Sequence, residues 1–207
     1  MALLFANNNS LSAISAKPSG LSGGSMNLIS TQTASSSATL SFTSGIDDTY
    51  DEYVFKFYDI HAQTQNALFQ VNFRDGGTNY DAVKTTTLFG AYHYEDNSDA
   101  GLGYRASSDL AQSTAYQDLI QFNLISNGND SSLVGKLKLF NPSSTTFVKH
   151  FLATTNSVND GNGSDKDYSD NSFIAGYCNT TTAIDGVQFK MSTGNIDSGG
   201  IKLYGIS

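Results

Sequence analysis

Polar and apolar residues alternate along most of the chain after residue 38, and this period of two predicts β-strands. Residues 53–60 place Tyr53, Phe55 and Phe57 on one face and more polar side chains on the other. Residues 132–141 repeat the pattern with leucines and lysines. Segments rich in Asn, Gly, Pro and Ser separate the alternating runs, as is typical of turns between strands.

Ten strands are predicted in this way, at 38–43, 53–60, 68–73, 84–94, 118–125, 132–141, 146–156, 173–179, 183–191 and 200–206. Only residues 109–117 have a composition compatible with one or two helical turns. Many short strands at this spacing indicate a sandwich or a barrel. The long links at 94–118 and 157–172 favour an all-β, antiparallel β-sandwich of the jelly-roll or Greek-key type.

The first 38 residues differ from the rest, because they are rich in Ser, Asn, Ala and Gly and offer little apolar area for a core. We therefore predict an extended N-terminal arm at 1–38 and a β-sandwich domain at 39–207. Large apolar side chains scattered along the arm are candidates for anchoring it on a neighbouring subunit or partner: Leu3, Leu4, Phe5, Leu11 and Ile14. The alternative is a tail that packs on its own domain or frays.

The acidic net charge of the chain argues against two classes of binding partner. The chain has 11 Lys and Arg against 19 Asp and Glu, a net charge of −8, and no run of basic residues. Binding to a phosphate backbone or to anionic lipid needs such basic groups, so neither nucleic acid nor a membrane is an expected partner. No apolar run is long enough to span a bilayer, and the start of the chain lacks the basic region of a signal peptide.

Candidate catalytic chemistry is sparse. The carboxylates cluster in loops, at 47–48, 51–52, 95–96 and 165–170, where they serve solubility. His93 and Glu95 would share a face if their strand continued, while Cys178 fits a small buried apolar residue better than a nucleophile. No nucleophile elbow, phosphate loop or zinc signature occurs, so the chain is predicted not to be an enzyme and to need no cofactor.

Two ligand classes remain as alternatives. Residues 160–165 place oxygen ligands at the first, third and fifth positions of a calcium loop, but Asp165 stands where glycine is required, so no metal site is assigned. Tyr92, Tyr94 and Tyr104 fall in or near segments rich in Asn and Asp, where exposed aromatic rings could contact a glycan.

Several stretches considered together carry a resemblance to a known group of proteins. They are 2–14, 44–53, 139–146 and 184–206, the last containing Phe189-Lys190-Met191-Ser192, Gly194-Asn195-Ile196-Asp197 and Leu203-Tyr204-Gly205. These stretches resemble small virion structural proteins of marine tailed bacteriophages, including those of cyanobacteria, and the resemblance covers essentially the whole chain. It implies a β-rich particle component, such as a capsid decoration, a head fibre or a tail appendage.

The leading hypothesis is therefore a non-enzymatic virion protein, assembled in the host cytoplasm, that forms a homotrimer and docks through its arm on major capsid or tail proteins. Trimer formation would cover the flat faces and edge strands that a sandwich exposes. The alternative is a carbohydrate-binding adhesion module that recognises host surface glycan through the loop tyrosines. A third hypothesis is a depolymerase-type hydrolase on a β scaffold.

Overall fold

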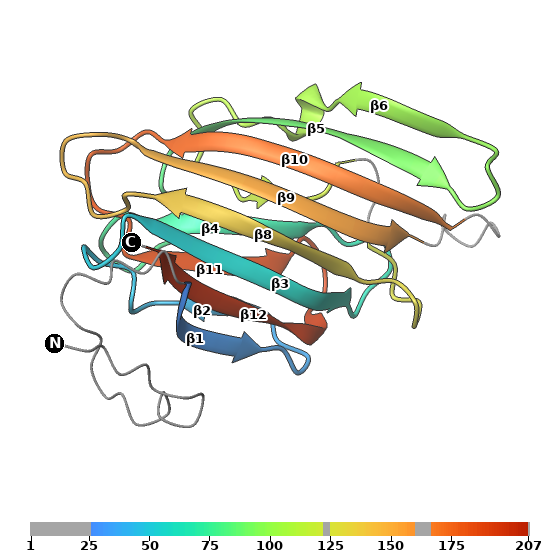
Figure 1. Cartoon of the computed structure of the whole chain (residues 1–207), viewed down its shortest axis with the longest axis horizontal. Helices are drawn as coiled ribbons and strands as arrows, with labels where there is room; N and C mark the ends of the chain where they lie inside the picture. Colours follow the sequence, from blue (N-terminus) through green and yellow to red (C-terminus); the bar gives the residue numbers. More distant parts are fainter. Residues whose placement is uncertain (1–25, 122–124, 160–166, 207) are drawn as a thin grey trace, which may run out of the picture.

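The computed structural model describes residues 26–121, 125–159 and 167–206. These residues form an antiparallel β-sandwich of one eight-stranded sheet, sheet A, and one four-stranded sheet, sheet B. Figure 1 shows sheet A from β6 at the top to β1 at the bottom, with sheet B lying against one side of it. All pairings between named strands are antiparallel.

The strands of sheet A, in spatial order, are β1 (Asn27–Thr33), β12 (Ile196–Ile206), β3 (Glu52–Ala62), β8 (Leu133–Phe140), β9 (Lys149–Asn159), β10 (Tyr168–Cys178), β5 (Lys84–Tyr94) and β6 (Ala100–Tyr104). Those of sheet B are β2 (Leu40–Phe42), β11 (Gly186–Met191), β4 (Phe69–Arg74) and β7 (Gln117–Asp118). The one helical element in the described ranges is the short 3-10 helix η2 (Ala106–Ser108).

The predicted all-β sandwich is confirmed, and most predicted strands are present. The prediction at 84–94 coincides with β5, and those for β3, β4 and β8 differ from the structure by one or two residues at the ends. These segments alternate strictly and end in turn residues, so period and punctuation locate them together.

Other predictions were wrong in part. Residues 109–117 contain no helix, and the helical turn η2 of the described part lies just before them. Of the strand expected at 118–125, only β7 forms, and residues 122–124 lie outside the described part. The region 157–172 is less of a link than expected, because β9 continues to Asn159 and β10 begins at Tyr168.

Two edge strands of sheet A were not predicted from the sequence. β6 lies within the expected link at 94–118, and it pairs with β5. β1 lies within residues 1–38, where an arm is expected, and it pairs with β12. Both are rich in Gly, Ser, Thr or Asn, and neither shows the strong alternation of the inner strands.

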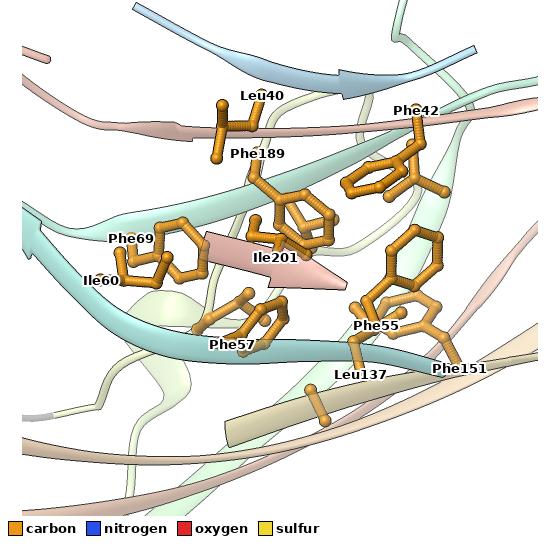
Figure 2. Packing of buried hydrophobic residues seen from close by; sticks show 14 of the residues in the cluster. Leu40, Phe42, Phe55, Phe57, Ile60, Phe69, Leu137, Phe151, Phe189 and Ile201 are labelled. Atoms are coloured by element: carbon orange, nitrogen blue, oxygen red, sulfur yellow. The ribbon is translucent and has the colours of Figure 1, made fainter. Parts of the chain in front are cut away.

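The core lies between the two sheets and is centred on Phe189 of β11. The ring of Phe189 lies 5.2 Å from that of Phe57, 5.5 Å from Phe55 and 5.7 Å from Phe69, centroid to centroid. Phe55 and Phe57 belong to sheet A, whereas Phe69 and Phe189 belong to sheet B (Figure 2). Each is almost completely buried. The aromatic cluster therefore joins the sheets, and aromatic pairs in such arrangements stabilise a core beyond the area they bury.

Phe189→Ala is expected to lower the free energy of unfolding by about 4 kcal/mol, because it removes ring contacts to both sheets and leaves a cavity. Chemical denaturation would measure this loss. Phe147→Ala is the matched control, since Phe147 is 70% exposed. It should change the free energy of unfolding by less than about 0.5 kcal/mol. Equal effects of the two substitutions would contradict the central place of Phe189.

Candidate functional site

The outer face of sheet A, the side turned away from sheet B, carries a continuous row of paired residues across all eight strands. Residues directly opposite in an antiparallel ladder share one face of the sheet. The pairings give the order Thr31, Lys202, Lys56, Lys136, Thr154, Phe173, Phe89 and Tyr104, from β1 to β6. The row thus changes from three lysines to three aromatic residues, dividing the face into a basic half and an apolar half.

The apolar half contains five of the exposed large hydrophobic side chains of this face. We call it the apolar patch, and it consists of Phe89, Leu102, Tyr104, Leu152 and Phe173. Phe89 and Phe173 stack with their ring centroids 5.2 Å apart, and Leu102 is 78% exposed. Two adjoining shallow grooves, of about 320 and 240 Å³, share Leu152 and Ala175 in their walls.

The central strands under this patch have no formal charge on their outer side. The outward-facing residues of β5, β9 and β10 include no Asp, Glu, Lys or Arg; they are Thr85, Thr87, Phe89, Ala91, His93, His150, Leu152, Thr154, Asn156, Val158, Ser169, Asn171, Phe173, Ala175 and Tyr177. For a chain with a net charge of −8, such a neutral face is unusual. Contiguous exposed apolar surface of this kind indicates an interaction site.

The basic half is formed by β12, β3 and β8. We call Lys202, Lys56 and Lys136 the lysine row, because each is the direct register partner of the next. Lys138, on the same face of β8, lies 2.7 Å from the carboxylate of Glu52. The sequence suggested no basic cluster, and it is the pairing of distant strands that creates one.

The tyrosines proposed as glycan contacts do not form one site. Tyr104 lies on the outer face beside Phe89, in the apolar patch. Tyr92 and Tyr94 lie on the other side, where the Tyr94 ring packs 4.9 Å from that of Tyr168. The Tyr92 hydroxyl donates to the carboxylate of Asp99 at 2.9 Å. Strand alternation therefore places Tyr104 on one face of the sheet and Tyr92 and Tyr94 on the other, and glycan contact by any of them stays a prediction.

The candidate acid–base groups are also kept apart. β5 ends at Tyr94, so Glu95 is not carried on the strand that holds His93. His61 has two partners, Asp197 of β12 at 3.4 Å and the carbonyl of Gly128 in the loop before β8 at 3.0 Å. Within the described residues, no three His, Cys, Asp or Glu side chains are grouped as metal ligands would be.

Three buried polar groups cross the inner side of sheet A. Lys84, Cys178 and Lys149 are register partners on β5, β10 and β9, and all three are fully buried. The Lys84 ammonium donates to the carbonyl of Ala115 at 2.7 Å, and the Lys149 ammonium donates to two carbonyls of the β10–β11 loop at 2.7 and 3.1 Å. Each lysine thus ties a loop to the sheet through backbone oxygens.

Burial determines the titration of this trio. It lowers the pKa of Lys84 to about 8 and lowers that of Lys149, because the charged ammonium is removed from water. Burial also raises the pKa of the Cys178 thiol to about 12, so the thiol stays neutral and unreactive. Cys178 therefore occupies the core, as the sequence interpretation expects.

The remaining sequence candidates lie outside the described residues. They are the anchor side chains Leu3, Leu4, Phe5, Leu11 and Ile14, and the possible calcium loop at 160–165. Conversely, the lysine row and most of the apolar patch were not predicted from the sequence. Alternation marked Lys136 and Lys138 as residues of one face, but no local signal places Lys56 and Lys202 beside them.

Searches against protein families, curated proteins and solved structures found no match. In the described ranges, no helix has the length and apolar character required to span a membrane. The function must therefore be inferred from the site itself.

Lys84→Met should remove most of a rise in stability between about pH 7 and pH 9, because burial lowers the pKa of Lys84 more than that of Lys149. The folded-state pKa of Lys84 is lower than the unfolded value, so the unfolded chain binds more protons in this range and raising the pH favours the folded state. The expected rise in the free energy of unfolding is about 1 kcal/mol. Urea denaturation of wild type and variant at both pH values would measure it.

Lys136→Met is the matched control, because Lys136 is exposed. This variant should keep the wild-type rise. Above about pH 9 the high pKa of the buried thiol acts in the opposite sense, since the unfolded chain then loses a proton that the folded chain keeps. An unchanged rise in Lys84→Met would contradict the assignment of the effect to Lys84.

Proposed function

We propose that the protein is a non-enzymatic structural component of a virus particle, which assembles as a homotrimer through the apolar patch and attaches to capsid or tail proteins through its N-terminal arm. The observation that carries the proposal is the absence of formal charge on the outward side of β5, β9 and β10 in a strongly acidic chain. The resemblance of the sequence to virion structural proteins of marine phages supports the particle role.

A second copy of the chain is the occupant that charge favours for the apolar patch. Two chains that each carry −8 repel each other over most of their surfaces. At the patch, no carboxylate or ammonium on β5, β9 or β10 has to lose its water, while rings and leucines are buried. Two copies that meet at the apolar patch therefore have the lowest cost in charge repulsion and desolvation.

The shape of the patch is compatible with closed symmetry. It covers one half of a face and reaches β6, an edge strand, so a neighbouring copy can pack beside it and leave the other half of the sheet open. Contacts of this head-to-tail kind form a ring when the rotation between neighbouring copies closes, and an open filament when it does not. Three copies give a ring in which three weak attachments to a particle act together.

The first prediction of this proposal concerns mass. Light scattering on a sizing column should give about 66 kDa, three times the chain mass of 22.1 kDa. Phe173→Glu combined with Leu152→Glu should give a folded monomer, because both charges would be buried in the contact. Phe147→Glu is the control, since Phe147 is an exposed phenylalanine outside the patch, and it should remain trimeric. A monomeric wild type at all concentrations, or a trimeric double variant, would refute the interface.

A second prediction concerns attachment. Replacing Leu3, Leu4 and Phe5 by Ser in the full-length chain should abolish association with purified particles while the mass in solution stays that of the trimer. Replacing the three asparagines at 7–9 by Ser is the control of equal size, and it should leave attachment intact. Co-sedimentation with the particles measures both. Full decoration by the Leu3, Leu4 and Phe5 variant would show that the arm is not the anchor.

A further inference from the structure

The lysine row places like charges next to one another, which does not stabilise a β-sheet. Lys202, Lys56 and Lys136 stand directly opposite one another on adjacent strands, which lie about 4.8 Å apart. Like charges in direct cross-strand pairs are destabilising. The chain has few basic residues to place, yet three of them meet here.

Few carboxylates of the protein lie close enough to neutralise the positive charge of the lysine row. On the outward positions of 52–58, 134–140 and 200–206 there are four lysines and one carboxylate, Glu52, which pairs with Lys138. No ion pair in the described part of the chain involves the lysine row. These positions therefore carry 4 − 1 = +3, and the exposed Asp59, which follows Tyr58 on β3, lowers the sum to +2, still opposite in sign to the −8 of the whole chain.

Two tyrosines hold the lysines in position. The Lys56 ammonium lies 5.4 Å from the ring centroid of Tyr204, and the Lys202 ammonium lies 5.2 Å from that of Tyr58. Such contacts attract a cation to the ring face without changing its charge. These contacts favour the observed positions of the two ammonium groups, and such preorganisation reduces the entropy lost on binding.

We propose that the lysine row, with Tyr58 and Tyr204, binds a linear acidic polysaccharide that carries carboxylate or sulfate groups. Evenly spaced cations match a polymer with repeated anionic groups. Hydroxyls of Thr31 and Thr154 continue the row at its two ends, where sugar hydroxyls can hydrogen-bond to them. The tyrosines add amphipathic rings of the kind that sugars contact.

A nucleic acid is the less suitable polyanion. Its affinity depends on many phosphate contacts, since duplex DNA carries a charge every ~1.7 Å along its axis. The lysine row and the neighbouring Lys138 offer only four ammonium groups, and the remaining surface of this acidic chain repels a ligand of such charge density. A polysaccharide with fewer charges and many hydroxyls is repelled less and gains more from hydroxyl partners.

This inference goes beyond the proposed function and does not require it. The lysine row lies on β12, β3 and β8, whereas the apolar patch lies on β9, β10, β5 and β6. A trimer formed through the patch would leave the row open to a ligand. The two ideas can therefore fail independently, one in a mass measurement and the other in a binding measurement.

The test is binding of the full-length protein to alginate, a linear polyuronate, by calorimetry in about 0.15 M salt, with neutral dextran and single-stranded poly(dT) as comparison ligands. Alginate should bind and dextran should not. Lys56→Gln combined with Lys136→Gln should weaken alginate binding about tenfold or more. Lys190→Gln is the matched control, because Lys190 also lies over a tyrosine ring, that of Tyr116, but on sheet B, and its affinity should stay within about twofold of wild type.

Three results would overturn the inference. They are an undiminished affinity of the double variant, equal binding of dextran, and tighter binding of poly(dT) than of alginate, which would identify a nucleic-acid surface instead. Sizing of the same samples shows whether the double variant keeps the wild-type mass. Loss of alginate binding at unchanged mass assigns the site to the lysine row, independently of assembly.

Discussion

Packing of aromatic rings between the two sheets is the interaction on which the rest of the structure depends. Phe189 of β11 meets Phe55 and Phe57 of β3, and Phe73 of β4 meets Phe151 of β9 at 4.8 Å. These contacts fix which side of each strand faces inward. Since side chains alternate along a strand, the inner packing also determines what the outer face of sheet A presents.

The outer face is therefore a consequence of register. A shift of one residue in β3 would bring Phe57 to the surface and Lys56 into the core, at a large cost in free energy. The same row that brings Lys202, Lys56 and Lys136 together continues into Phe173 and Phe89 on the other half of the sheet. Charge and apolar surface are separated along one row, so the two halves can serve two partners.

The buried lysines show a different use of the same residue type. Lys84 and Lys149 face the core, where burial lowers their pKa values. The Lys84 ammonium donates to a carbonyl of the segment before β7, and the Lys149 ammonium donates to two carbonyls of the β10–β11 loop. The hydrogen bonds offset part of the cost of removing these groups from water. Lysine is thus structural on the inner side of sheet A and available to ligands on the outer side.

Local sequence patterns were enough to predict the fold class and the position of several inner strands. Strict alternation in 53–60, 84–94 and 132–141, with turn residues between them, was sufficient to locate β3, β5 and β8. It was insufficient for β1 and β6, because edge strands bury little on one side and need not alternate.

The candidate site could be read from the sequence only in fragments. Tyr104 was recognised as a possible contact, but Tyr92 and Tyr94 turned out to lie on the opposite side of the sheet. Residues 56, 136 and 202 become neighbours only when β12, β3 and β8 pair, and such pairing is non-local. Local periodicity decides which face of a strand is apolar, whereas only the tertiary structure decides which strands lie side by side.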